Sequence, residues 1–84
     1  MRAVYFYLMR EDPERVRSAV PQHAAYWHTG DLQGYLGGPF ADRSGGLIIF
    51  ESETAEDAAR LVASDPFVIE GLVESSWLKE WRPE

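Results

Sequence analysis

The chain has 84 residues, of which 45% are hydrophobic and 26% charged, and its formal net charge is −6. These values are typical of one globular domain, so we expect a single domain over residues 1–84. The negative charge argues against nucleic acid or an anionic membrane as a partner, because an acidic surface gains nothing from counterion release. The absence of cysteine excludes disulfides, thiolate zinc sites and a cysteine nucleophile, and it agrees with a cytoplasmic protein.

The first predicted element is a strand over residues 3–9, an apolar run too short to cross a membrane. A helix is predicted to begin at Pro13, with Asp12 as its cap. Pro21 removes a backbone hydrogen bond, so we expect a kink there or a helix that begins near it. Apolar residues recur at helical spacing and share a stripe with His23; they are Val16, Val20, Ala24 and Trp27.

The middle of the chain predicts a β-hairpin, because LQGYLGGPF and GGLIIFES flank the turn-forming loop ADRSG. A second helix is predicted over residues 52–64, with Ser52 or Thr54 as its cap, and a last strand over residues 74–83. The order strand, helix, strand, strand, helix, strand is typical of the ferredoxin-like α+β fold. That fold is a four-stranded antiparallel sheet with both helices on one face.

The predicted sheet is apolar on both faces, although a strand with one wet face alternates apolar and polar residues. In the first strand the two faces are formed in alternation by Val4, Tyr5, Phe6, Tyr7, Leu8 and Met9. Two helices cover one face only, so the other face needs a cover. We therefore predict a homodimer in which the two sheets pack face to face.

Two segments carry the candidate chemistry. In SDPFVIEGL, Asp65 precedes Pro66, so it ends one helix and caps a short new one, which explains the aspartate without any reaction. A histidine on an apolar stripe, such as His23, is most often a partly buried side chain bonded to a nearby polar group. If the two residues meet, the carboxylate orients the imidazole as a base. His28 lies about 140° from His23 around the helix, so no metal site is predicted.

Aromatic side chains and turn glycines are candidate walls for a small molecule. Core and dimer packing is the other explanation for the rings Tyr5, Tyr7, Trp27 and Trp77. Backbone N–H groups near Gly37 and Gly38 are a candidate site for a developing oxyanion. Three arginines near the first helix are explained by solvation or by an anionic ligand; they are Arg10, Arg15 and Arg17.

The ordered set VPQHAAYW, GGPF, GGLIIFES and SDPFVIEGL, followed by a closing Trp-Arg, resembles the YciI-like (YCII-related) family over nearly the whole chain. That family looks like a branch of the dimeric α+β barrel superfamily, which implies the same fold and a dimer. The resemblance implies a catalytic pair at His23 and Asp65, with Gly38, Pro39 and Phe67 beside it. One relative is a dehydrochlorinase. The family often has arginine where Val20 stands here, which argues against anion binding at that position.

These features together predict a small enzyme without a cofactor. Its His-Asp pair is expected to move a proton, in an isomerisation or an elimination, on a small aromatic or carbonyl-containing substrate. One alternative is a non-catalytic dimeric module that binds a small ligand or a partner chain. Another alternative is a cofactor-free monooxygenase.

Overall fold

A four-stranded antiparallel sheet forms one layer of the structure, a computed structural model that describes residues 1–84. The elements are, in order, β1 (Arg2–Met9), α1 (Pro13–His28), β2 (Leu36–Pro39), β3 (Gly45–Glu51), α2 (Ala55–Ala63), α3 (Pro66–Ile69) and β4 (Val73–Glu80). The strand order is β2-β3-β1-β4, which places β1 between β3 and β4. The predicted ferredoxin-like α+β fold is confirmed, with α3 as a short additional helix.

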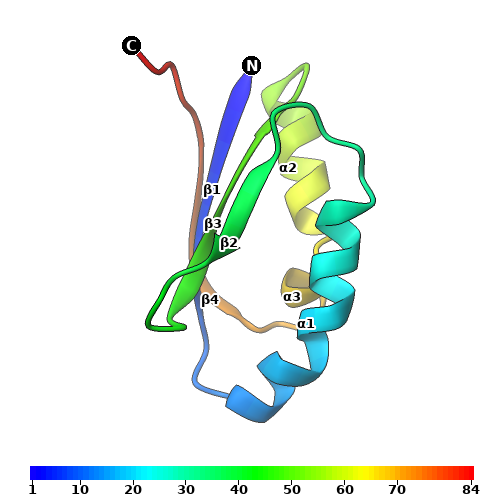
Figure 1. The fold of residues 1–84 in the computed structure, drawn as a ribbon, viewed down its shortest axis with the longest axis vertical. Coiled ribbons are helices and arrows are strands. Elements are labelled where there is room, and N and C mark those ends of the chain that lie inside the picture. Colours follow the sequence, from blue (N-terminus) through cyan, green and yellow to red (C-terminus); the bar gives the residue numbers. More distant parts are fainter.

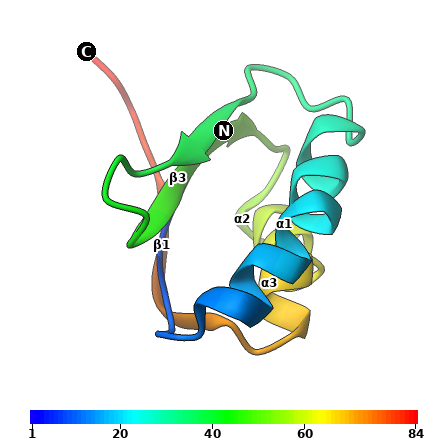
Figure 2. The same ribbon diagram turned by 60° about the horizontal axis from the view of Figure 1, so that its bottom comes forward.

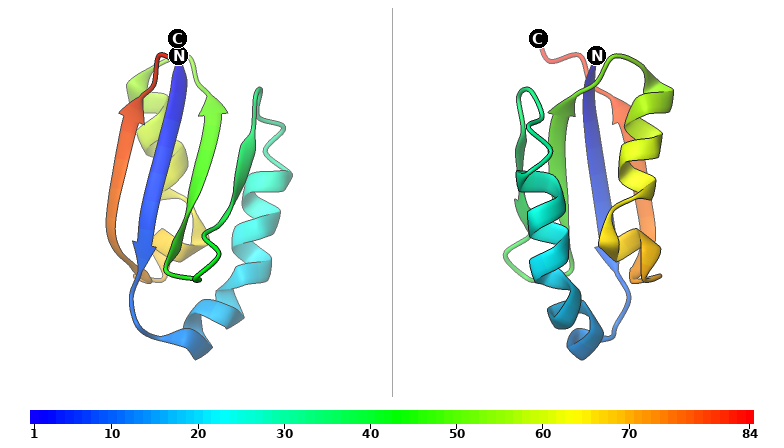
Figure 3. Two further views of the ribbon diagram at one scale, coloured as in Figure 1. Left: turned by 60° about the vertical axis from the view of Figure 1, so that its left-hand side comes forward. Right: turned by 90° about the vertical axis from the view of Figure 1, so that its right-hand side faces the viewer.

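All three helices lie on one side of the sheet (Figure 1). Figure 2 shows the same two layers after a turn of 60° about the horizontal axis. The left view of Figure 3 shows the opposite face, where no helix covers the strands. None of the helices has both the length and the apolar character that a membrane-spanning helix requires. The core lies between the two layers and consists of Ala3, Tyr5, Tyr7, Ala19, Trp27, Ile48, Phe50, Ala58, Phe67 and Leu72.

Side chains of β1 alternate between the two faces of the sheet. Tyr5 and Tyr7 are buried on the helix side, whereas 37% of the surface of Phe6 is exposed. Phe6 is paired with Leu47 on β3 and with Trp77 on β4, so these three side chains share the face without helices. The prediction that the sheet is apolar on both faces is confirmed.

The helix α1 is continuous through Pro21, so a helix that begins near this proline, one of the two predicted alternatives, is wrong. Pro21 has no N–H group to donate to the carbonyl of Arg17, one turn earlier. Figure 1 shows that α1 changes direction between its blue N-terminal part and its cyan part, in agreement with the predicted kink.

The buried stripe of α1 differs in one position from the predicted one. It passes through Ala19, His23 and Trp27, which are four residues apart, whereas Val20 is 44% exposed. Neighbouring positions differ by about 100° around a helix, so Ala19 and Val20 do not both face the sheet. The stripe therefore brings His23 toward the core and leaves Val20 at the surface.

Two glycines at the start of β3 allow this strand to lie close against β1. A Cβ atom at Gly45 would overlap the backbone oxygen of Tyr7 and would lie 2.8 Å from its carbonyl carbon. A Cβ atom at Gly46 would overlap the Tyr7 hydroxyl group and would lie 2.8 Å from the backbone oxygen of Gly38. Glycine is therefore required at both positions, and the ring of Tyr7 occupies the space that Gly46 leaves.

The substitution Gly45→Ala is expected to lower the free energy of unfolding by about 3 kcal/mol, because the added methyl group meets backbone atoms that do not move independently. Urea unfolding at one fixed protein concentration measures this loss. Gly30→Ala is the matched control, since its Cβ atom would meet nothing closer than 3.5 Å. A loss at Gly45 no larger than the loss at Gly30 would contradict the close approach of the two strands.

Candidate functional site

Asp65 stands between α2 and α3 and caps the second of these helices. Its backbone is extended, with φ −61° and ψ 129°, as the following Pro66 requires. Its Oδ1 atom accepts a hydrogen bond from the backbone N–H of Phe67 at 2.8 Å. Gly71, at φ +70°, then turns the chain toward β4. The predicted capping role of Asp65 is therefore present in the structure.

The same carboxylate accepts hydrogen bonds from two side chains of α1. His23 Nδ1 lies 2.9 Å from Oδ1 and 3.1 Å from Oδ2 of Asp65, and Trp27 Nε1 donates to Oδ2 at 2.9 Å. Asp65 is 0% exposed. A carboxylate without contact to water needs several donors, and here it has three, so capping and side-chain contact occur together.

His23 is held on three sides. Its Nδ1 atom faces Asp65, and its ring stacks on Phe67 with centroids 3.9 Å apart and planes 12° apart. Its Nε2 atom lies 3.4 Å from the Tyr7 hydroxyl. Because the carboxylate only accepts, the network assigns the proton of neutral His23 to Nδ1 and leaves Nε2 as the acceptor.

Two tyrosines of β1 complete the polar centre. Burial, and then the nearby Asp65 carboxylate, raise the pKa of both Tyr5 and Tyr7 above the usual tyrosine range. Tyr7 therefore keeps its proton at neutral pH and donates toward His23 Nε2. The Tyr5 hydroxyl is buried without any hydrogen-bond partner, although its ring stacks on that of Tyr7 at 5.0 Å.

The structure brings most of the predicted site residues together around His23 and Asp65, but the two on β2 lie away from them. Tyr7, Trp27 and Phe67 all contact His23 or Asp65, and Tyr5 lies behind Tyr7. Gly38 and Pro39 are exposed on the edge strand β2. Gly38 is paired with Leu47, so its free Cα side belongs to the face without helices.

Two contributions to the site were not predicted. Trp27 was expected only as an apolar wall, yet its indole N–H binds the buried carboxylate. The spacing of four residues between His23 and Trp27 on one helical stripe is the signal that points to a shared acceptor. Gly46 makes room for the Tyr7 hydroxyl, and no pattern within β3 itself indicates that role.

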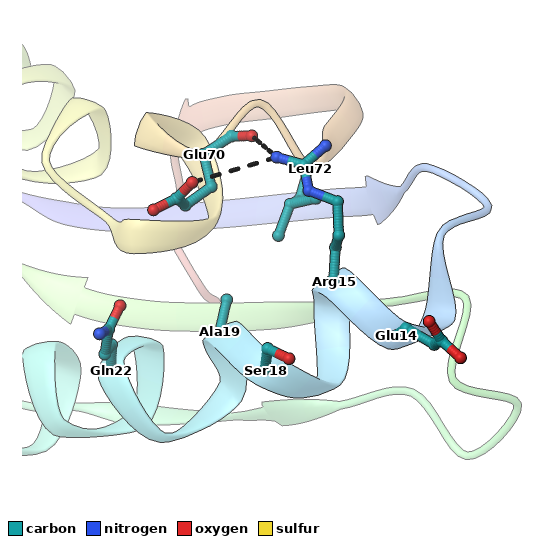
Figure 4. A pocket seen from close by; sticks show the side chains of 7 residues that line it. All are labelled: Glu14, Arg15, Ser18, Ala19, Gln22, Glu70 and Leu72. Atoms are coloured by element: carbon teal, nitrogen blue, oxygen red, sulfur yellow. Dashed lines mark hydrogen bonds and ion pairs between the residues drawn. The ribbon is translucent and has the colours of Figure 1, made fainter.

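Two main hollows lie close to this centre, and neither is lined by His23 or Asp65. The first, of about 430 Å³, lies between α1 and α3 and is mostly polar. Figure 4 shows Arg15 reaching across it to Glu70, whose backbone oxygen accepts from Arg15 Nη2 at 2.8 Å. Ala19 and Val20, one turn before His23, line the first and the second hollow respectively. No group of three or more His, Asp and Glu side chains is placed to hold a metal ion.

Comparison with protein families and curated proteins gives two matches. A family model described as YCII-related domain matches residues 1–82. Over 45 residues the chain is 40% identical to YjpA of Bacillus subtilis (strain 168), which is described as an uncharacterized protein. This match covers 54% of the chain and 52% of YjpA, so it spans about half of the length of that relative.

Three solved structures share the fold. The 5-chloro-2-hydroxyhydroquinone dehydrochlorinase TftG from Burkholderia phenoliruptrix AC1100, in complex with 2,5-dihydroxybenzoquinone, gives a TM-score of 0.82 at 24% identity, over 98% of this chain and 94% of TftG. Rv0793 from Mycobacterium tuberculosis gives 0.55 at 11% identity, over 99% and 95%. Atu4242 from Agrobacterium tumefaciens gives 0.54 at 19% identity, over 99% and 92%. At these identities the likeness shows the fold alone.

The substitution Asp65→Asn is expected to lower the free energy of unfolding by about 2 to 3 kcal/mol. The amide is uncharged and offers one acceptor oxygen to three N–H donors, so at least one buried donor is left facing the amide NH2 group without an acceptor. Urea unfolding measures the loss. Asp57→Asn is the control, because Asp57 lies at the surface of α2 and pairs only with Arg60. Equal losses in the two variants would contradict the role of Asp65 as the shared acceptor.

Proposed function

Because the chain belongs to the YCII-related domain family, we propose that it is a proton-transfer enzyme with His23 as base and Asp65 as its orienting carboxylate. The observation that carries this proposal is the pair of contacts between His23 Nδ1 and a carboxylate that is itself fully buried. A histidine held in this way has a defined tautomer and a defined ring orientation. Both properties are needed for a general base.

The proton is taken up at Nε2, the nitrogen that faces away from Asp65. The Tyr7 hydroxyl lies 3.4 Å from this nitrogen, which is a long contact, and a substrate hydroxyl replaces it on binding. The stacked ring of Phe67 keeps the imidazole plane fixed while the proton moves. Asp65 stabilises the imidazolium that results, because its carboxylate lies 2.9 Å from Nδ1.

Two reactions follow from such a base. In an elimination, the proton passes from the substrate to Nε2 while a halide leaves the adjacent carbon with its bonding electron pair, so the net change is the loss of one hydrogen halide. In an isomerisation, the base returns the proton to a different atom of the same substrate. Neither reaction needs an oxidant. The dehydrochlorinase name of TftG, a structural neighbour at 24% identity, supports the elimination and a small ring as substrate.

A non-catalytic ligand-binding module is the second candidate function, and one specific observation favours it. The side chain of His23 is only 14% exposed, and the two main hollows are lined by other residues. In such a module the contacts of Asp65 serve only to hold α1 and α3 together. Turnover distinguishes the two candidates, because the module has no reaction to lose.

The test substrate is 5-chloro-2-hydroxyhydroquinone, and chloride release is the measurement. The enzyme is expected to release chloride, and His23→Gln and Asp65→Asn are expected to lower the rate by about 10² to 10⁴. His28→Gln is the control, since His28 lies on the exposed side of α1, against Tyr35. The affinity for 2,5-dihydroxybenzoquinone is measured in parallel, and we expect it to change little.

Unchanged rates in the His23 and Asp65 variants would contradict the catalytic pair. If the unmodified protein binds 2,5-dihydroxybenzoquinone but neither releases chloride nor exchanges the ring hydrogens of this ligand with deuterated solvent, the binding module is the correct function.

We also infer a homodimer that packs through the sheet face without helices. Phe6 lies at the centre of this face, with Phe40 at 5.1 Å and Trp77 at 5.3 Å between ring centroids. Trp77 is 48% exposed and Leu36 is 70% exposed. An apolar area of this kind is unusual on a monomer. A second copy presents the same area about a two-fold axis, and the dimeric α+β barrel type of fold supports this pairing.

Trp77→Arg is expected to raise the dissociation constant of the dimer about thirtyfold, because it places a charge in the contact beside Phe6 and removes a large ring. Sedimentation equilibrium measures the constant. Ile69→Arg is the control, since Ile69 is 68% exposed but lies on α3, on the other side of the molecule. A stable monomer at micromolar concentration of the unmodified protein would refute the dimer.

A further inference from the structure

The second hollow, of about 950 Å³, lies where β1 ends and α1 begins. Its walls come from the end of β1 and the loop that follows it, the first half of α1, the loop between β2 and β3, and Glu74 of β4. Apolar contributions include Met9, Val16 and Val20. Its volume falls in the range of small-molecule sites, about 300 to 1,000 Å³.

Three arginines also line this hollow, and they are the three that no carboxylate neutralises. The chain has seven arginines, and four of them lie within 4.0 Å of an aspartate or glutamate oxygen; these are Arg2, Arg15, Arg60 and Arg82. Arg10, Arg17 and Arg43 have no such partner. Arg10 Nε already donates to the backbone oxygen of Gly71 at 3.1 Å, whereas the side chains of Arg17 and Arg43 bond to no other residue. In a chain with 14 acidic residues, two unpaired guanidinium groups around one hollow indicate a site for an external anion.

Arg43 has a second unusual property. Its backbone lies in the left-handed region, at φ 66°, which is uncommon for a residue other than glycine, asparagine or aspartate. Its N–H group donates to the backbone oxygen of Phe40 at 2.9 Å, which holds it in the tight loop between β2 and β3. Glycine would adopt this conformation with less strain. The backbone conformation therefore does not explain why this position carries an arginine.

The charges of the lining restrict the anion. Glu11, Asp12 and Glu74 line the same hollow, and Asp12 is already bound by the backbone N–H and the guanidinium of Arg15. These carboxylates repel a ligand with two or more negative charges, such as a phosphate, more strongly than a ligand with one. A ligand with one negative charge and an apolar body suits a hollow whose lining carries both arginine side chains and the apolar side chains of Met9, Val16 and Val20.

We propose that the second hollow binds a small aromatic monoanion, a carboxylate or a phenolate, with its charged group on Arg17 and Arg43 and its ring against Val16, Val20 and Met9. The binding itself is independent of any reaction. Val20 is three residues before His23 on α1, one helical turn away. The further step that this anion is the substrate rests on the proposed function of His23 and Asp65.

The first hollow provides a contrast. Its arginine, Arg15, is occupied by the backbone oxygen of Glu70 at 2.8 Å and lies 4.0 Å from the Glu70 carboxylate (Figure 4). An anion there has to displace contacts within the chain, whereas the guanidinium groups of Arg17 and Arg43 form none with another residue. The aromatic monoanion therefore binds at the second hollow.

Benzoate is the probe, and NMR of the full chain is the measurement. Benzoate is expected to shift the Nε–H signals of Arg17 and Arg43 and the methyl signals of Val16 and Val20. Benzyl alcohol, which has the same ring without the charge, is expected to bind at least about tenfold more weakly than benzoate. Inorganic phosphate is expected to compete poorly with benzoate. NMR shifts confined to the residues of the first hollow, or equal affinities for benzoate and benzyl alcohol, would overturn the proposal.

Arg17→Gln and Arg43→Gln are each expected to weaken benzoate binding about tenfold. Arg60→Gln is the control, because Arg60 is paired with Asp57 on α2, away from the hollow. Arg43→Gly separates a backbone role from a side-chain role: we expect it to raise the melting temperature and still weaken benzoate. Unchanged affinity in the Arg17 and Arg43 variants would overturn the proposal.

One further outcome is decisive. If the Arg17 and Arg43 variants alter the dissociation constant of the dimer but not the affinity for benzoate, these arginines bind carboxylates of a second copy and the proposal is wrong. Failure of benzoate to bind leaves the tests of His23 and Asp65 unaffected, since those measure chloride release. If the His23 and Asp65 variants lose chloride release but still bind benzoate, the result supports both proposals separately.

Discussion

The structure depends on one buried carboxylate. Asp65 accepts a backbone N–H from the start of α3 and two side-chain N–H groups from α1, so it joins segments that lie about forty residues apart. Apolar packing alone does not fix how one helix is rotated against another, because it is not directional. Hydrogen bonds to one acceptor are directional. Asp65 therefore sets which side of α1 faces the sheet, and that choice places His23 beside Tyr7.

The polar centre is also shaped by a close approach of two strands. Gly45 and Gly46 bring β3 against β1, and the hydroxyl of Tyr7 enters the space that a side chain at Gly46 would fill. The imidazole nitrogen opposite Asp65 thus meets a tyrosine that keeps its proton. Both nitrogens of one histidine ring have assigned neighbours, one from a helix cap and one from a strand.

Local patterns were sufficient for the fold and for part of the site. Asp-Pro predicted the cap at Asp65, and alternation along β1 predicted two apolar faces, because both signals depend on neighbours in the chain. The stripe on α1 was misplaced by one position at Val20, since helical spacing alone does not distinguish adjacent candidates. The N–H of Trp27 and the space beside Gly46 arise from contacts between distant segments, which spacing within one segment does not reveal. For the same reason the sequence placed Gly38 with the site, whereas pairing in the sheet turns its free side away.

The alternation of β1 has a consequence for how this protein evolves. Its odd-numbered residues, such as Tyr5 and Tyr7, surround the polar centre, and its even-numbered residues, such as Phe6, form the opposite face. Both sets are carried by one strand of eight residues in the middle of the sheet. An insertion or deletion of a single residue in it would exchange the two sets at once. A substitution in this strand changes one surface, whereas a shift of register changes both.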